Sequence, residues 1–356
     1  LCEANYHVSN GHCIPCANTH YNAAGDDPNG GTNTACDVCA DLIPGATEAL
    51  CTNATNAQAT LCDTTSYYED NGVCYCKENY RVSSGTCTAC VGSSMENVAG
   101  DDPRYSDSLC DCVIPNHVVL KQDVDLLNAG TIASQSCPSV PIEQWDISKV
   151  TTLDNMFEDH INFDGNISLW DVSNVESLHR TFYNASSFNT DISAWDVAKA
   201  TTLSGMFAMA SAFDSDLSTW DVSKVESLES TFHDASSFDA DLSSWDVSKV
   251  TSLAKTFYGA GNFNSDLSEW NMSSVSTMLS VFHGASSFTS NLASWDIAKV
   301  TTLFGTFQSA AAFNSDLSTW NVAKVETLES IFRGASLFNS NISSWDISKV
   351  TSLAEA

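Results

Sequence analysis

The chain has 356 residues and a formal net charge of −30 at pH 7, with 44 Asp and Glu against 14 Lys and Arg. Such an acidic chain repels nucleic acid and anionic lipid, so we expect neither as a partner. No apolar run approaches the roughly 18 residues that a membrane span needs. The sequence starts at Leu1, with neither an initiator Met nor a signal-peptide pattern, and stops inside a repeat. We therefore expect a piece of a longer protein.

All 14 cysteines lie before residue 138. An even number confined to one region is typical of a disulfide framework formed in an oxidising compartment, so the pattern predicts an extracellular protein with seven disulfides. The cysteines concerned are Cys2, Cys13, Cys16, Cys36, Cys39, Cys51, Cys62, Cys74, Cys76, Cys87, Cys90, Cys110, Cys112 and Cys137. Five glycosylation sequons agree with that location. They begin at Asn53, Asn166, Asn184, Asn271 and Asn341.

A duplication is visible among the cysteines. Residues 2–16 match residues 76–90, and each copy is followed by Ala-Gly-Asp-Asp-Pro. The first copy also contains two Cys-x2-Cys pairs at the spacing of a four-thiolate zinc site. The closing pair of the second copy, Cys110-x-Cys112, is tighter and would strain such a site. The pattern therefore favours two disulfide-bonded modules over zinc.

The nine tryptophans recur every 25 residues without an insertion or deletion. They are Trp145, Trp170, Trp195, Trp220, Trp245, Trp270, Trp295, Trp320 and Trp345. A fixed period in the twenties predicts a solenoid, in which each coil is stable only because its neighbours cover it. The terminal coil then needs a cap, and residues 113–140 are the candidate. The expected segments are a cysteine-rich module at 1–39, a cysteine-containing spacer at 40–75, a second module at 76–112, the N-terminal cap at 113–140 and the solenoid at 141–356.

The spacing of the apolar residues changes within one coil, from every second residue to a helical spacing. Trp220 and Val222 flank Asp221, which predicts a short parallel strand with the two apolar side chains inward. Apolar positions then recur at i, i+3, i+4 and i+7 from Leu228, which predicts a short helix over residues 228–235. Two phenylalanines also recur at equivalent positions of the coils. We interpret these aromatic columns as hydrophobic core and not as a ligand-binding site. The predicted fold class is an α/β solenoid of nine coils, similar to a leucine-rich repeat.

The repeat over residues 141–356 resembles the BspA-like surface-protein repeat. The shared pattern is Trp-[Asp/Asn]-[Val/Ile]-Ser-Lys-Val-x-x-Leu-x-x-[Thr/Met]-Phe-x-x-Ala-x-x-Phe. This resemblance implies a leucine-rich-repeat-like solenoid, a role in adhesion or host contact and no shared catalytic residue. Residues 2–39 and 76–112, with their Asn-Tyr-x-Val-Ser-x-Gly core, resemble the cysteine-rich modules of epidermal growth factor and tumour-necrosis-factor receptors, which form extracellular stalks.

Two acidic columns accompany the tryptophans. Directly after each tryptophan comes Asp or Asn, which we expect to accept hydrogen bonds from the backbone of the following turn, with a lysine column three residues later balancing the charge. A second column precedes each tryptophan, and its oxygen ligands would suit calcium, although turn capping or an amide ladder explains it equally. The calcium candidates are Asp191, Asp216, Asp241, Asp266 and Asp316. No other cofactor is expected.

Catalytic motifs are missing from the sequence, and the histidines never pair at ligand spacing. We expect no enzyme. The sequence favours an extracellular structural or adhesive surface protein. Its last coil leaves an apolar edge that we expect to meet either further coils of a longer chain or the N-terminal part of another copy, which would give head-to-tail filaments. The alternative is a secreted or cell-surface receptor that binds a protein or glycan on one face of the solenoid. A receptor should show a patch where the columns break, as they do at residues 271–274.

Overall fold

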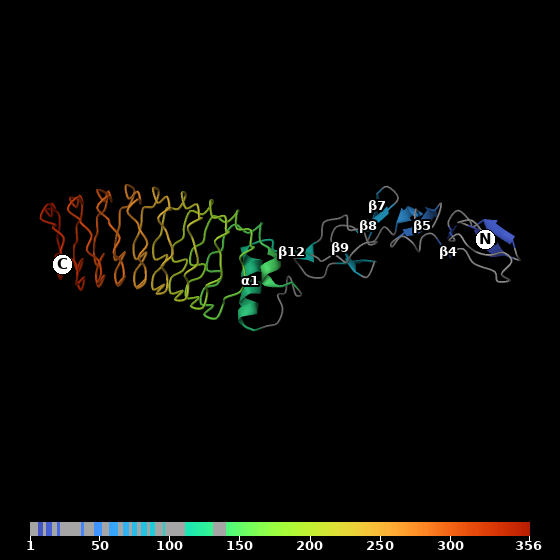
Figure 1. Cartoon of the computed structure of the whole chain (residues 1–356), viewed down its shortest axis with the longest axis horizontal. Helices are drawn as coiled ribbons and strands as arrows, with labels where there is room; N and C mark the ends of the chain where they lie inside the picture. The colour runs from blue at the N-terminus through green and yellow to red at the C-terminus, as the bar shows by residue number, and fades with distance from the viewer. Residues whose placement is uncertain are drawn as a thin grey trace. The chain divides into compact units, whose positions relative to one another are not determined.

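The structure, a computed structural model, describes residues 111–130 and 140–356 and, before them, the strands of the cysteine-rich region. The chain divides into two compact units, Leu1–Cys112 and Val113–Ala356 (Figure 1). The side chains of all 14 cysteines lie outside the described residues, and so does Asn53. The disulfides, their zinc alternative and glycosylation at Asn53 therefore stay predictions.

The first unit repeats one hairpin. Strand β1 (Tyr6–Ser9) pairs antiparallel with β2 (His12–Pro15), and β9 (Tyr80–Ser83) pairs with β10 (Thr86–Ala89). In both hairpins the first residue of the first strand lies opposite the last residue of the second. The duplicated sequences thus form hairpins of the same register.

A smaller strand pair is also repeated. Strand β3 (His20–Tyr21) pairs with β4 (Asp37–Val38), and β11 (Met95–Glu96) pairs with β12 (Asp111–Val113). Between the two copies, the expected spacer contains two further hairpins. One joins β5 (Ala46–Cys51) to β6 (Ala57–Cys62), and the other joins β7 (Tyr67–Asp70) to β8 (Val73–Cys76).

The second unit begins with helix α1 (His117–Asn128). Its N-cap, Asn116, accepts a hydrogen bond from the Val119 N–H at 3.1 Å, which satisfies one of the unpaired donors of the first turn. Leu120 and Val124, one turn apart, are fully or almost fully buried. His117 Nδ1 donates to the Thr152 carbonyl of the first coil at 3.0 Å. The helix thus covers one end of the solenoid.

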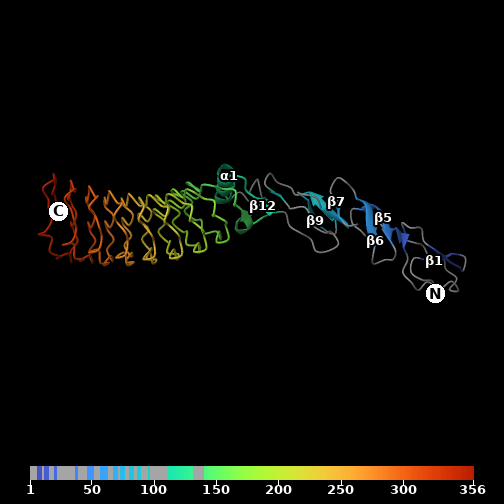
Figure 2. The same cartoon turned by 90° about the horizontal axis from the view of Figure 1, so that it is seen from above.

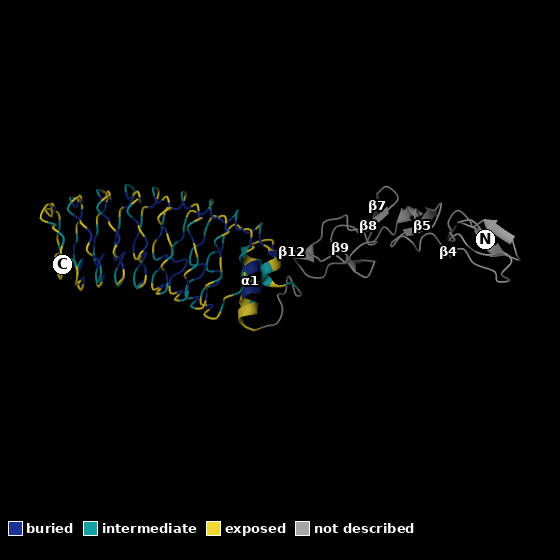
Figure 3. Ribbon diagram, in the orientation of Figure 1, coloured by how far each residue is buried: buried dark blue, intermediate teal, exposed yellow. Residues whose placement is uncertain are grey.

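The rest of the second unit is a stack of 25-residue coils. Figures 1 and 2 show the coils side by side, and Figure 3 shows the buried residues on the inner side of each coil. The 3-10 helix η2 (Ile142–Gln144) and strand β13 (Trp145–Asp146) open the first coil. Parallel bridges then join equivalent residues of successive coils, from Thr152 to Ser352. The tryptophan period predicted this solenoid.

The predicted strand over residues 220–222 is wrong, although the predicted orientation of its side chains is confirmed. Trp220 and Val222 are 4% and 1% exposed, while Asp221 is exposed. Within residues 140–356 only β13 is an assigned strand. Asp146 makes the same turn bond and still belongs to a strand, because β12 pairs with β13, whereas in the described coils no backbone bridge joins residues 220–222 to a neighbouring coil. The bridge to the next coil forms later, at Ser227.

The predicted helix over residues 228–235 is also wrong, because this segment is a run of tandem turns. Its N–H groups donate three residues back, as Thr231 does to Leu228, or to the next coil, as Phe232 does to Thr256. An α-helix would instead donate four residues back. Each turn still points an apolar side chain into the core. The apolar residues therefore have the spacing of a helix although the backbone is not helical. The coils are therefore not the strand and helix units of a leucine-rich repeat.

Two positions in these turns have left-handed backbone, those of Ser230 (φ 57°) and Asp234 (φ 55°). Right-handed helices exclude such residues, and non-glycine residues adopt them only at a cost in free energy. The equivalent residues are also left-handed: Asn155, Asp159, Arg180, Asn184, Gly205, Met209, Lys255, Gly259, Ser280, Gly284, Gly305, Ser309, Ser330, Gly334 and Glu355. Hydrogen bonds to the next coil hold the backbone in this conformation.

The aromatic columns form the core, as predicted. The Phe232 ring lies 3.9 Å from that of Phe238 in its own coil and 5.6 Å from that of Phe257 in the next, stacked in both cases. Each tryptophan also reaches the preceding coil, which the spacing alone did not reveal. The Trp245 Nε1–H donates to the Leu217 carbonyl at 3.0 Å. Equivalent bonds recur from Trp170 to Trp345.

Buried threonines add another link between coils. Thr256 Oγ1 lies 3.0 Å from the Leu228 carbonyl and 2.7 Å from the Leu253 carbonyl, so its proton is shared between two coils. We expect Thr256→Val to lower the free energy of unfolding by about 1–2 kcal/mol, measured by urea denaturation. The exposed Thr251 makes a similar bond to Glu226 at 3.1 Å. Thr251→Val should cost less than about 0.5 kcal/mol. Equal losses of stability in the two variants would show that burial of the threonine does not strengthen the contribution of its hydrogen bond.

Candidate ligand-binding face

The polar column after the tryptophans is structural. Asp221 accepts the Ser223 N–H at 3.0 Å, and Asn271 accepts the Ser273 N–H at 3.1 Å. The predicted hydrogen bond to the following turn is confirmed in every coil. The Ser223 hydroxyl and N–H lower the pKa of Asp221, and Lys224 adds a smaller attraction. The break at residues 271–274 therefore leaves the turn intact.

We expect acid to destabilise the solenoid through these turns. A carboxylate whose pKa is lower in the folded state stabilises the fold above its unfolded pKa, and this contribution is lost as the pH falls through the folded pKa. Serine two residues on lowers the pKa of Asp171, Asp191, Asp221, Asp241, Asp246, Asp266, Asp316 and Asp346. Urea unfolding should therefore show a free energy that decreases below about pH 4.

The matched control for this pH dependence is a variant with Asn at positions 171, 221, 246 and 346. Asn keeps the acceptor oxygen, as Asn271 and Asn321 do, but does not titrate in this range. Its free energy of unfolding should decrease less between pH 5 and pH 2 than that of the unaltered chain. The same decrease in both proteins would show that other carboxylates are responsible.

The calcium candidates form a second column of capped turns. Asp216 accepts the Ser218 N–H at 2.8 Å, and Asp191, Asp241, Asp266 and Asp316 do the same with the residue two positions later. A neighbouring column links successive coils by hydrogen bonds from backbone to side chain, as Asp214 accepts the Asp239 N–H of the next coil at 2.8 Å. In residues 113–130 and 140–356, no three His, Cys, Asp or Glu side chains converge on a metal position. Calcium binding stays a prediction.

Three of the sequons coincide with these capped turns. Asn166 accepts the Ser168 N–H at 3.1 Å, and Asn271 and Asn341 make the same bond to the serine two residues later. Asn166 and Asn341 belong to the column of the calcium candidates, and Asn271 belongs to the column after the tryptophans. In both columns Asn in place of Asp creates the Asn-x-Ser tripeptide, so the turns themselves explain these sequons. Asn184 differs, because its Nδ2 donates to Asp159 at 2.9 Å. Glycosylation at these sites stays a prediction.

A different set of positions varies from coil to coil. We call it the turn face and define it by Asp154, Asn155 and Glu158 of the first coil and their equivalents 25 residues apart. The later occupants are His179, Arg180 and Tyr183; Ser204, Gly205 and Ala208; Glu229, Ser230 and His233; Ala254, Lys255 and Tyr258; Leu279, Ser280 and His283; Phe304, Gly305 and Gln308; Glu329, Ser330 and Arg333. Most of the large side chains among them are at least partly exposed.

Contacts connect the turn face across coils. Arg180 Nη2 lies 2.7 Å from Glu158 Oε1 in the preceding coil. The ring of Tyr258 lies 4.7 Å from that of His233 and 4.3 Å from that of His283. The variable side chains therefore form a continuous surface that crosses the coils.

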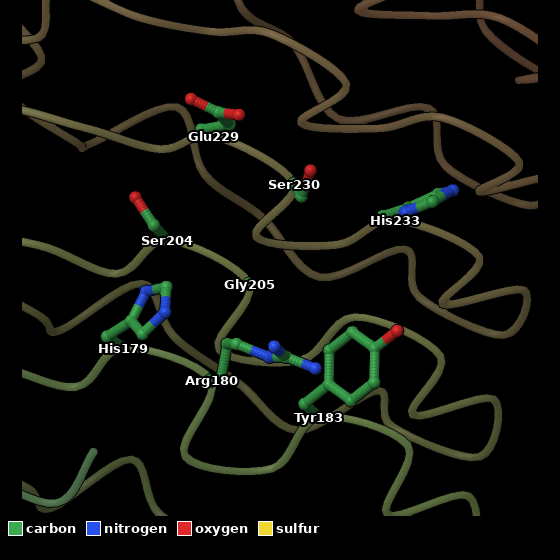
Figure 4. Close-up of a pocket in the computed structure, with 8 residues that line it drawn as sticks. All are labelled: His179, Arg180, Tyr183, Ser204, Gly205, Glu229, Ser230 and His233. Atoms are coloured by element: carbon green, nitrogen blue, oxygen red, sulfur yellow. The ribbon is translucent and has the colours of Figure 1, made fainter. Parts of the chain in front are cut away.

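A depression of about 490 Å³ opens on this face (Figure 4). Figure 4 shows Arg180 and Tyr183 from one coil and Glu229 and His233 from the second coil after it. The coil between them carries only Gly205 and Ala208 at the corresponding places, and both are buried. Gly205 has φ 67°, and a Cβ there would meet Arg180 Cγ at 2.9 Å. The small residues of the middle coil therefore create the hollow.

The positive charge at the depression is already paired. Arg180 pairs with Glu158, and its Cζ lies 3.9 Å from the centre of the Tyr183 ring. Burial lowers the pKa of His233, and Asp234, 3.4 Å away, only partly opposes this effect. His233 is therefore mostly neutral at pH 7 and presents one ring nitrogen as donor and one as acceptor.

Sequence reasoning missed this site. It treated the histidines as scattered surface residues and searched for a break in the uniform columns. The signal was present in the alignment of the coils with one another, because positions 154, 155 and 158 change in size and charge from coil to coil. What the sequence did not show is that His179 and His233 line the same hollow.

A stack of 25-residue coils with one variable face defines a tandem-repeat solenoid protein. The chain belongs to the family described as "Mycoplasma protein of unknown function, DUF285", whose model matches residues 131–238, 195–291 and 266–356. These overlapping matches together cover more than half of the chain, as expected for a tandem repeat. No curated protein and no solved structure shows a significant match to it. Among the described residues no helix has the length and apolar character of a membrane span.

Proposed function

We propose that the chain is an extracellular surface protein that binds its partner through the turn face. The observation that carries this proposal is the change in size and charge at three neighbouring positions on a scaffold whose core and capping columns repeat. Core and capping positions need the same residue types in every coil because every coil packs on its neighbours. Repeat proteins often bind their partners through one extended face of the stack, and side chains that differ between coils can make such a face specific.

The extracellular location is supported by the cysteines. Thirteen of the fourteen lie in the first unit, whose two duplicated segments form hairpins of the same register. The resemblance to BspA-like surface proteins agrees with adhesion, and the resemblance of the first unit to receptor modules agrees with a stalk. The three capped-turn sequons do not add independent support, because the turns explain them.

The test of this function is a binding screen followed by surface mapping. The whole chain is screened against printed extracellular-matrix proteins and printed oligosaccharides. For any ligand found, Tyr183→Ala, His233→Ala and Tyr258→Ala combined should weaken binding at least about tenfold. The control combines Lys224→Ala, Lys249→Ala and Lys299→Ala, three exposed positions of the lysine column. A ligand that depends on the lysines and not on the turn face would contradict the proposal.

Head-to-tail assembly is a second proposal, supported by the apolar surface of the last coil. Ile347 and Leu353 are 45% and 50% exposed and line a hollow of about 350 Å³ with Phe332 and Trp345. Further coils of a longer chain would cover this surface, and in their absence a second copy would bury the same apolar area, which favours association. Sedimentation should show a mass that increases with concentration, and Leu353→Lys should abolish the increase. A constant monomer mass at high concentration would contradict assembly.

A further inference from the structure

We propose that the depression on the turn face binds one neutral sugar residue of a glycan. This inference rests on the proposed function, because it names the ligand class of the same face. It concerns only the hollow between the coils of Arg180 and Glu229 and not the whole surface.

The size of the hollow suits one ring of a longer molecule. Its volume of about 490 Å³ falls within the range of small-molecule sites, about 300–1,000 Å³. It is open to the surface between coils, so a ligand bound there can continue on either side. Ser204 and Gly205 of the middle coil line the hollow with small side chains, and the coils on both sides supply the larger ones.

The hydrogen-bonding groups suit a polyhydroxylated ligand. Sugar hydroxyls both donate and accept, so a sugar site needs donors and acceptors close together. Arg180 can only donate, Glu229 as a carboxylate can only accept, and the hydroxyls of Ser204 and Ser230 can do both. The ring of Tyr183 adds an apolar surface with a polar tip to the same wall.

The charges and the lining disfavour two other ligand classes. The Arg180 guanidinium is already paired with Glu158 at 2.7 Å, and Glu229 adds a negative charge, so the hollow has no surplus positive charge for an acidic ligand. Its lining residues include no Leu, Ile, Val, Met, Phe or Trp. Protein partners are usually anchored by large side chains that fill well-packed pockets, and this open polar hollow is not such a pocket.

The site is already organised before a ligand binds. Arg180 has left-handed backbone, with φ 53°, and its guanidinium is held between Glu158 and the Tyr183 ring. Its Nε is buried and has no hydrogen-bond partner. A side chain held in one place loses little entropy on binding, so even one sugar residue gains useful affinity.

The experiment uses the whole chain and a printed array of oligosaccharides. The array carries neutral ends of galactose, glucose, mannose and N-acetylglucosamine, and acidic ends of sialic acid and sulfated sugars. We expect binding to neutral ends only. Calorimetry with the soluble oligosaccharide that binds should then show at least a tenfold loss of affinity for Glu229→Gln and for Tyr183→Ala.

Matched controls occupy the same positions in distant coils. Glu329→Gln corresponds to Glu229→Gln and Gln308→Ala corresponds to Tyr183→Ala, and both should change the affinity less than twofold. All four variants should melt within a few degrees of the unaltered chain, which shows that they fold.

Several outcomes overturn the inference. No binding to any oligosaccharide, binding to acidic ends alone, or neutral binding that survives both Glu229→Gln and Tyr183→Ala would each do so. A matrix protein that binds through the turn face while no oligosaccharide binds would also overturn it, yet the proposed function would stand. A ligand that depends on the lysine column would instead contradict the proposed function.

Discussion

Replacing Trp245 with alanine is expected to lower the free energy of unfolding by about 3–5 kcal/mol. The side chain lies mid-stack and is 3% exposed. Its Nε1–H donates to the Leu217 carbonyl of the preceding coil at 3.0 Å, and its ring lies 6.2 Å from that of Phe232. Truncation therefore leaves a cavity and removes one of the two hydrogen bonds that the Leu217 carbonyl accepts, the other coming from the Trp220 N–H at 3.1 Å. Urea unfolding followed by circular dichroism measures the loss.

Trp245→Phe separates the two contributions. Phenylalanine retains much of the buried apolar area but has no N–H for the Leu217 carbonyl, so we expect a loss of about 1–2 kcal/mol from the hydrogen bond, plus a smaller packing loss. Unchanged stability in Trp245→Ala would show that the tryptophan column is not core. Equal losses in the two variants would show that the hydrogen bond, and not packing, accounts for the effect.

Much of the solenoid could be predicted because its main features repeat. Trp220 and Val222 point inward and Asp221 caps a turn, as their alternation and chemistry indicated. Repetition makes such predictions robust, since each coil is an independent instance of the same pattern. The column of calcium candidates was open between several roles, and its hydrogen bonds show the capping role.

The local backbone could not be predicted from the same spacing. Apolar residues at i, i+3, i+4 and i+7 fit a helix and also fit tandem turns that return inward at each step. The choice depends on where the N–H groups donate and on the left-handed backbone at Ser230 and Asp234. Neither residue type signals that conformation strongly, although glycine at the equivalent positions 205 and 259 gives an indication.

The candidate site escaped prediction for a related reason. Its residues come from three coils, and each residue is ordinary within its own coil. Ser204 and Gly205 leave a hollow only because larger side chains lie on both sides. A site of this kind appears when positions are compared between coils, not when motifs are sought along the chain.

The second large loss of stability is expected from a substitution in α1, the helix that caps the first coil. Leu120→Asp places a carboxylate where α1 has a fully buried side chain. An unpaired buried charge is costly, so the helix should leave the first coil, at a cost of about 3 kcal/mol or more. Val118→Asp is the matched control, because Val118 lies on the same helix and is 61% exposed. This control should change the stability by less than about 0.5 kcal/mol.

Hydrogen exchange should show how far the damage from Leu120→Asp extends. A solenoid is stabilised by contacts between neighbours, so loss of the cap should weaken the first coils most. The N–H groups of Leu153 and Phe157 donate to the second coil and should exchange faster in the variant. The N–H of Phe257, which donates to Val281 in mid-stack, should keep its protection. Equal loss of protection at all three amides would mean that the stack unfolds as one cooperative body and that stability is not a sum over adjacent coils.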